Sequence, residues 1–123
     1  MKTGVVLFAH GSRDPEWAAP FRAIERKLAT ARPDAHVALA FLELMQPTLA
    51  DTVDRMVAAG CGRITIAPLF MAQGAHLKRD LTRLIDDASA RHPTVQIAAL
   101  PAAGEADGVM NAIGDWIAQS IER

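Results

Sequence analysis

Two histidines and one glutamate lie where their side chains could bind a metal ion and accept protons. His10 follows the apolar run 4–9, Glu43 lies in the apolar segment 41–44, and His76 follows a glycine-containing loop. Two imidazoles and a carboxylate suit a divalent first-row transition metal such as cobalt, nickel or iron. Histidine also titrates near neutrality, so it can accept a proton as well as a metal. Because three ligands leave coordination positions open, the set favours transient handling of a metal over permanent storage.

Four strands and four helices are predicted to position these residues. Apolar or β-branched segments predict strands at residues 4–9, 36–44, 63–70 and 94–100. After each strand, apolar residues recur at spacings of three and four, which predicts a helix. The predicted helical stripes are Trp17, Phe21, Ile24 and Leu28; Leu49, Val53, Met56 and Val57; Leu77, Leu81, Leu84, Ile85 and Ala88; and Val109, Met110, Ile113, Trp116 and Ile117. Such alternation is typical of a parallel sheet with right-handed crossovers. We expect one α/β domain over residues 1–123, a three-layer sandwich around a four-stranded parallel sheet ordered 2-1-3-4.

This predicted sheet brings the three candidate side chains to one edge. In an open parallel sheet, ligands bind at the carboxyl ends of the strands, in the crevice where strand order reverses. With the order 2-1-3-4, His10 and His76 would face each other across that crevice. Glu43 follows the second strand, and an ionisable group in an apolar segment needs a partner or a function. His36 and His92 precede the second and fourth strands, so we expect them in solvated loops at the opposite edge.

Basic and hydroxyl side chains beside the two site histidines could bind an anionic ligand. Ser12 and Arg13 follow His10, and Lys78 and Arg79 follow His76. Guanidinium and ammonium groups bind carboxylates through charge-assisted hydrogen bonds. These four residues are therefore the candidate substrate-binding residues.

The composition argues against several other classes of protein. Half of the 123 residues are apolar, a content that argues against a disordered chain. The formal net charge is −1, so the chain lacks the basic excess of a nucleic-acid-binding protein. No apolar run approaches the ~20 residues of a membrane span, and the first residues lack the features of a secretory signal. We therefore expect a cytoplasmic protein. The only cysteine, Cys61, is expected to be a small buried thiol.

Three motifs of the chain resemble those of the small class II chelatases, the CbiX/SirB-type sirohydrochlorin chelatases of cobalamin and sirohaem synthesis. The motifs are Phe8-Ala9-His10-Gly11-Ser12-Arg13, Phe41-Leu42-Glu43, and Pro68-Leu69-Phe70-Met71-Ala72-Gln73-Gly74-Ala75-His76. Asp80 also fits the family pattern, and the resemblance covers almost the whole chain. The chain departs from the pattern at Thr82, where related chains often have proline, and at residues 100–103, where a leucine–glycine pair is common.

The resemblance implies a flavodoxin-like half fold and an enzyme that inserts a divalent metal (cobalt, nickel or iron) as substrate into sirohydrochlorin, without an organic cofactor. It assigns catalysis to His10, His76 and Glu43, and metal binding to the two histidines. Sirohydrochlorin is a polycarboxylate, which Arg13, Lys78 and Arg79 could anchor. The resemblance also implies a homodimer. Four strands span only roughly 15–20 Å, about the width of a tetrapyrrole, so one subunit can cover only one face of the ring.

Other functions fit the sequence less well. A metal or tetrapyrrole carrier with little turnover is the main alternative, and turnover beyond one insertion per chain would separate it from an enzyme. A hydrolase would need a G-x-S-x-G elbow, and none of Ser12, Ser89 and Ser120 has that context. A nucleotide- or flavin-binding half domain would need more glycine and hydroxyl residues after the first strand. A receiver domain would need an aspartate at the end of the third strand.

Overall fold

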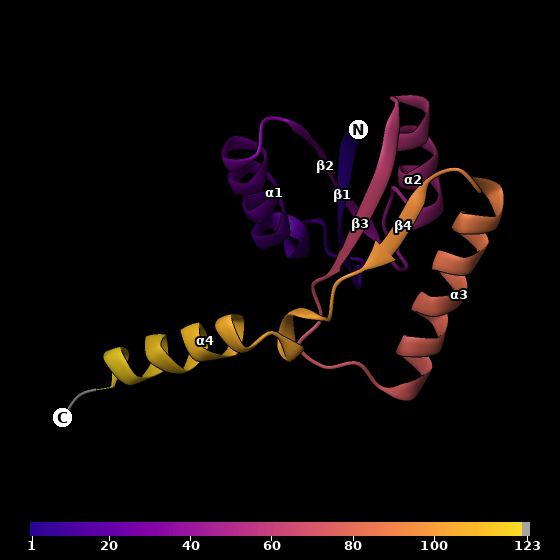
Figure 1. The fold of residues 1–123 in the computed structure, drawn as a ribbon. Coiled ribbons are helices and arrows are strands. Elements are labelled where there is room, and N and C mark those ends of the chain that lie inside the picture. Colours follow the sequence, from indigo (N-terminus) through magenta and orange to yellow (C-terminus); the bar gives the residue numbers. More distant parts are fainter. Residues whose placement is uncertain (122–123) are drawn as a thin grey trace.

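Four parallel strands form the centre of the computed structural model, which describes residues 1–121 (Figure 1). They are β1 (Lys2–Ala9), β2 (Ala35–Phe41), β3 (Cys61–Pro68) and β4 (Gln96–Ala99), arranged in the order β2-β1-β3-β4. All three neighbouring pairs are parallel. The predicted order 2-1-3-4 is thus confirmed. The carboxyl ends of β1 and β3 are adjacent, at the point where the strand order reverses.

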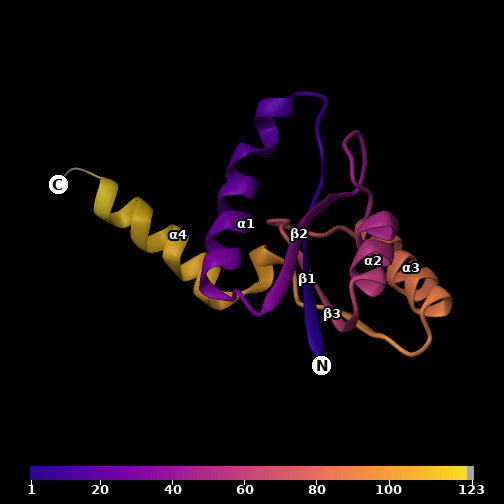
Figure 2. The same cartoon turned by 90° about the horizontal axis from the view of Figure 1, so that it is seen from above.

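A helix follows each strand, and the first three of these helices cover the two faces of the sheet (Figure 2). Helix α1 (Ala19–Ala31) lies on one face, and α2 (Leu49–Ala58) and α3 (Ala75–Arg91) lie on the other. A short 3₁₀ helix η1 (Pro15–Ala18) precedes α1, and a second, η2 (Ala103–Glu105), precedes α4 (Asp107–Ser120). Each helix lies where the apolar spacing predicted one. Within residues 1–121, no helix has the length and hydrophobicity that crossing a membrane requires.

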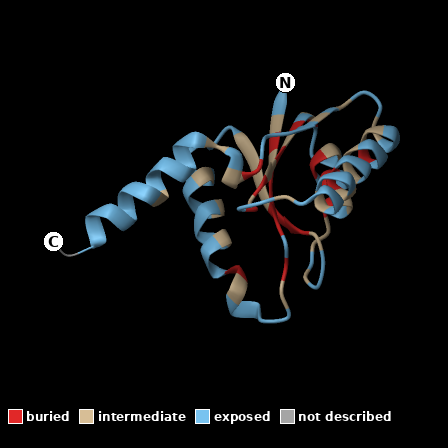
Figure 3. Cartoon of the chain, turned by 90° about the horizontal axis from the view of Figure 1, so that it is seen from below, coloured by how far each residue is buried: buried red, intermediate tan, exposed pale blue. Residues whose placement is uncertain are grey.

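The two faces of the sheet bury separate hydrophobic clusters, which hold the strand ends in place (Figure 3). Beneath α2 and α3 the cluster includes Val6, Phe8, Ile64, Ile66 and Phe70. On the face of α1 it includes Leu7, Ala9, Ala18, Leu39 and Phe41. Central strand β1 contributes to both clusters, as alternating side chains of a strand covered on both faces must. Cys61 is buried, as expected.

All four strands have bounds that differ from those predicted. Strand β1 begins two residues earlier, at Lys2, and β2, β3 and β4 end earlier because their apolar runs continue into loops. Strand β2 ends at Phe41, so Glu43 lies in the following loop, and the backbone at Leu44 turns with a φ of 65°. Strand β3 occupies Cys61–Pro68 where 63–70 was expected. Strand β4 has only 4 residues, Gln96–Ala99. Some apolar residues beyond a strand end, such as Phe70, are buried although they lie in a loop, so hydrophobicity alone overestimates strand length.

Helix α4 forms as predicted but does not bury its apolar stripe. None of its residues is buried. Among the described residues, η2 is the only element with which it makes extensive contact. Figures 1 and 3 show α4 extending away from the sheet, exposed along its length.

Candidate functional site

A direct hydrogen bond joins two of the three predicted site residues. Nε2 of His10 lies 2.9 Å from Oε1 of Glu43, and about half of each side chain is exposed to solvent. The backbone holds the two loops together as well: Glu43 N donates to His10 O over 3.0 Å, and Leu42 N donates to Ala9 O over 2.9 Å. The loops after β1 and β2 thus continue the strand pairing past the sheet edge and present both side chains to solvent.

Gly11 allows these two loops to approach so closely. Its φ is +102°, a conformation that side chains rarely adopt, and a Cβ atom there would lie 1.8 Å from the carbonyl oxygen of Glu43. Only glycine fits such a backbone position without rearrangement. The histidine–glycine pair of the first motif therefore has a local physical reason: Gly11 makes room for the loop that carries Glu43.

The hydrogen bond to Glu43 determines which nitrogen of His10 is available for chemistry. An ionised carboxylate only accepts hydrogen bonds, so Nε2 of His10 carries the proton and donates. In the neutral ring, Nδ1 then keeps a free lone pair, which can bind a metal or take up a second proton. The edge of the ring faces Phe70, with the ring centroids 6.4 Å apart and the planes at 77°. Carboxylates often orient metal-binding histidines in this way.

His76 is the second residue of α3, at the end of the molecule to which the strands point (Figure 1). Its Nδ1 atom lies 3.2 Å from the guanidinium of Arg79. Because arginine can only donate, Nδ1 is the acceptor of this bond, and Nε2 carries the proton when the ring is neutral. No group of three or more His, Cys, Asp or Glu side chains in residues 1–121 lies close enough together to hold a metal. The structure therefore joins His10 to Glu43, while His76 is paired with Arg79.

The predicted anion-binding residues lie beside the histidines in two places. The hydroxyl of Ser12 accepts from Asp14 N over 3.1 Å, which fixes the turn into η1, and Arg13 next to it is exposed. Lys78 and Arg79 are exposed on the first turns of α3. Together with Thr82, Arg83, Asp86 and Asp87, they line a shallow depression of about 450 Å³. Its lining comes from one helix face only, so we regard it as a basic margin and not as the reaction site.

Phe70 and Gly104 were missed as positioning residues by the sequence analysis. Phe70 is buried, packs edge-on against Phe8 and faces the ring of His10. Gly104 donates from its N to Phe70 O over 2.9 Å, and a Cβ atom there would lie 1.4 Å from the carbonyl oxygen of Met71. These contacts attach the loop after β3 to η2. In the sequence only the presence of a glycine at position 104 could have indicated this role, and a glycine alone does not show which residues it contacts.

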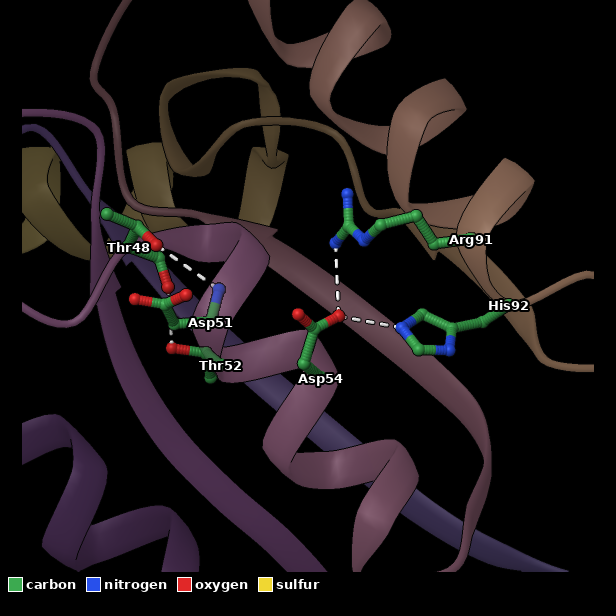
Figure 4. A network of polar contacts seen from close by, with 6 residues as sticks. All are labelled: Thr48, Asp51, Thr52, Asp54, Arg91 and His92. Carbon is green, nitrogen blue, oxygen red and sulfur yellow. Dashed lines mark hydrogen bonds and ion pairs between the residues drawn. The ribbon is translucent and has the colours of Figure 1, made fainter.

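At the opposite edge of the sheet, the expectation of solvated loop histidines is wrong for both His36 and His92. His36 lies within β2 and is half-buried, because the strand begins one residue earlier, at Ala35. Nε2 of His92 lies 2.7 Å from Oδ1 of Asp54, and only 20% of the His92 side chain is exposed (Figure 4). Arg91 donates to the same carboxylate over 3.2 Å. The hydrogen bond from His92 is the main cause that lowers the pKa of Asp54. The cluster connects the end of α3 to α2, because the chain must turn there before β4. The cluster is a structural contact at the end of the sheet opposite to the His10–Glu43 pair.

The chain is similar in sequence to proteins of one family. The family model CbiX matches residues 4–120. A sirohydrochlorin cobaltochelatase of Saccharolobus islandicus strain L.S.2.15 is 38% identical over 82 residues, which cover 67% of this chain and 62% of that protein. One from Methanococcus aeolicus is 31% identical over 81 residues, covering 66% of this chain and 57% of the relative. The chain thus spans less than two thirds of the length of these curated relatives.

Solved structures resemble the whole sheet and its helices. A CbiX protein from Marinobacter aquaeolei VT8, described in terms of cobalamin (vitamin B12) biosynthesis, has a TM-score of 0.83 and 30% identity, with 95% of both chains covered. The sirohydrochlorin chelatase SirB from Bacillus subtilis subspecies spizizenii, in complex with cobalt, has a TM-score of 0.77 and 27% identity. That match covers 98% of this chain and 51% of the other. Because the family model extends over nearly the whole sequence, this chain belongs to the CbiX family.

Proposed function

We propose that this protein is a sirohydrochlorin chelatase, which inserts a divalent metal into the tetrapyrrole ring. The observation that carries the proposal is the His10–Glu43 pair, exposed at the sheet edge of a chain that belongs to the CbiX family. The relatives named above are sirohydrochlorin cobaltochelatases, so cobalt is the first metal to test, followed by iron and nickel. All three metals suit imidazole ligands. Residues 1–123 would act as a single catalytic domain without an organic cofactor.

In the proposed reaction His10 receives the metal and Glu43 supports it. The free Nδ1 lone pair of His10 binds the ion, while the hydrogen bond from Nε2 to Glu43 fixes the orientation of the ring. Insertion displaces two pyrrole protons from the macrocycle. Glu43 is half exposed and already next to an imidazole, so it is the residue best placed to take up one of these protons, and the other is released to solvent.

His76 is proposed as the second imidazole ligand. In the structure Arg79 occupies its Nδ1 lone pair, and its Nε2 lone pair becomes available only after the proton shifts between the two nitrogens. Metal binding by His76 therefore requires a change of tautomer or the loss of the Arg79 contact. A substrate carboxylate that draws Arg79 away would release His76 at the moment when the macrocycle arrives.

The substrate is proposed to lie over the strand ends, held by its carboxylates. Arg13 and the hydroxyl of Ser12 lie next to His10 in sequence, and Lys78 and Arg79 lie next to His76. Ser12 accepts a backbone hydrogen bond but keeps its own proton to donate. Because the sheet edge is only about as wide as a tetrapyrrole, we propose that a homodimer encloses the second face of the ring.

The proposal is tested by mixing the protein with sirohydrochlorin and Co²⁺, Fe²⁺ or Ni²⁺ and following absorbance against the uncatalysed rate. We expect several insertions per chain for at least one metal, and a strong loss of rate in His10→Ala and in His76→Ala. His36→Ala, at the opposite sheet edge, is the matched control. A single insertion per chain would indicate a carrier, and wild-type rates in both site variants would disprove the assignment of the histidines.

A further inference from the structure

In the structure the proton of His76 lies on the ring nitrogen that a metal would reach first. The guanidinium of Arg79 donates to Nδ1 over 3.2 Å, so the proton of the neutral ring is on Nε2. Nδ1 is the nitrogen nearer to the backbone, and its partner Arg79 lies one turn further along α3. Nε2 is at the outer end of this exposed side chain. Metal binding through Nε2 therefore requires the proton to leave that atom.

A metal on Nε2 changes what the other nitrogen of His76 must do. The ring stays neutral, because the proton that Nε2 loses is replaced by a proton on Nδ1. Nδ1–H and the guanidinium of Arg79 are then both donors, so their present contact is lost. The second N–H of a metal-binding histidine is almost always held by an acceptor, frequently a carboxylate. The metal-bound ring of His76 thus needs an acceptor where Arg79 lies now.

Asp80 is the carboxylate placed to accept this hydrogen bond. It is the only acidic residue in the sequence from 72 to 85, and it follows His76 by four positions within α3. Residues four apart on a helix are neighbours on its surface, with Cβ atoms about 5–6 Å apart. Helical side chains also lean toward the N-terminus of the helix, which directs the carboxylate of Asp80 toward His76.

The present partner of Asp80 leaves the carboxylate available. A guanidinium nitrogen of Arg83 lies 3.3 Å from Oδ1 of Asp80, and 69% of the Arg83 side chain and 46% of the Asp80 side chain are exposed. A long ion pair between exposed groups contributes little to stability. A carboxylate also accepts several hydrogen bonds, so Asp80 can accept from His76 with or without Arg83.

We propose that Asp80 is the positioning residue of His76: it accepts the hydrogen bond from Nδ1–H when Nε2 binds the metal, and so takes the place of Arg79. The inference rests on the proposed chelatase function and extends the role of His76 within it. His10 has such a partner already in the free protein, because Glu43 accepts from its Nε2 and leaves Nδ1 for the metal. One histidine is thus oriented in advance, and the other is oriented by an exchange of partners as the metal binds.

Calorimetric titration of the full chain with Co²⁺ alone, without a tetrapyrrole, tests this role. We expect Asp80→Ala to weaken Co²⁺ binding by about 10-fold or more, the usual effect of removing the acceptor behind a metal-binding histidine. Asp80→Asn keeps a carbonyl oxygen that accepts from Nδ1–H, so it should recover part of the affinity. In a chain that already carries His76→Ala, Asp80→Ala should cause no further loss, because the residue through which it acts is absent.

Arg83→Ala is the matched control. It removes the same ion pair from the other side and leaves the carboxylate of Asp80 in place, so Co²⁺ should bind at least as tightly as to the wild-type protein. Alanine is the best helix former, and circular dichroism should show that all of these variants keep the wild-type helix content.

The outcomes separate this inference from the proposed function. Wild-type affinity in Asp80→Ala, combined with weaker binding in His76→Ala, would refute the role of Asp80 and leave His76 as a metal ligand. An equal loss in Asp80→Ala and Arg83→Ala would assign the effect to the ion pair. An equal loss from Asp80→Ala with and without His76 would show that Asp80 does not act through this histidine. Wild-type affinity in His76→Ala would refute the proposed metal binding by His76, and the inference with it.

Discussion

Nε2 of His10 donates a hydrogen bond to Oε1 of Glu43 over 2.9 Å, although the two residues are 33 positions apart in sequence. The contact exists because β1 and β2 are parallel neighbours whose pairing continues beyond both strand ends. The contact joins the motif that contains His10 to the motif that contains Glu43. It places the proton of the neutral His10 ring on Nε2 and leaves the lone pair of Nδ1 free.

Replacing Glu43 by glutamine should slow metal insertion by about 10- to 100-fold, because an amide cannot accept a proton from the macrocycle. The hydrogen bond itself can persist, so the fold and the thermal stability should stay unchanged. Initial rates of insertion at saturating sirohydrochlorin measure the effect. Glu16→Gln, an exposed carboxylate of η1, serves as the control and should keep the wild-type rate. Equal rates for the two variants would exclude Glu43 as the base.

Replacing Gly11 by alanine should destabilise the protein by about 2 to 4 kcal/mol, because its φ of +102° is strained for alanine and the new Cβ would collide with the Glu43 carbonyl. Urea unfolding measures the loss. Gly114→Ala, in helix α4, is the control and should have the opposite effect on stability, since nothing lies within 4 Å of a Cβ atom at that position. In a helix this substitution should stabilise by about 0.5–1 kcal/mol. A neutral Gly11→Ala would mean that the two loops can separate at little cost.

Replacing Arg79 by methionine should separate metal binding from substrate binding. The Nδ1 lone pair of His76 is freed, so Co²⁺ alone should bind at least as tightly as to the wild-type protein. The KM for sirohydrochlorin should rise about 10-fold, as expected for losing one hydrogen bond to a charged group. Calorimetric titration with Co²⁺ and steady-state kinetics give the two readouts. Arg26→Met, which replaces an exposed arginine of α1, should change neither. Weaker Co²⁺ binding in Arg79→Met would contradict the competition between Arg79 and the metal.

Replacing Asp54 by asparagine should reduce stability in a pH-dependent way. The pKa of Asp54 is lowered in the folded protein from its ordinary value of 3.8, mainly by the hydrogen bond from His92. The unfolded chain therefore binds this proton more readily, so the stabilisation is fully present above about pH 4 and is lost as the pH falls through the lowered pKa.

At pH 6 we expect the Asp54→Asn variant to be less stable by up to about 1 kcal/mol, since the carboxylate is half exposed. Thermal unfolding at pH 6 and pH 2.5 gives the comparison, and the difference should shrink at the lower pH. Metal insertion should not change, because the cluster lies at the opposite sheet edge. A constant difference at both pH values would show that the ion pair is not its source.

The sequence by itself determined the succession of strands and helices, because hydrophobic periodicity and short connections are local patterns. The order 2-1-3-4 was expected only as a common order of such parallel sheets, and the structure confirmed it. Strand ends were less well predicted, because Leu42 and Leu69 look like strand residues although they pack in loops.

Only the tertiary structure decided which side chains touch. The bond between His10 and Glu43, the pairing of His76 with Arg79 and the burial of His92 against Asp54 all join residues through contacts that periodicity does not encode. The exposure of α4 belongs to the same category. Its apolar stripe predicted a helix, but only the structure showed that none of the residues of this helix is buried. Short-range spacing sets the elements, whereas side-chain partners depend on distances between segments remote in the chain.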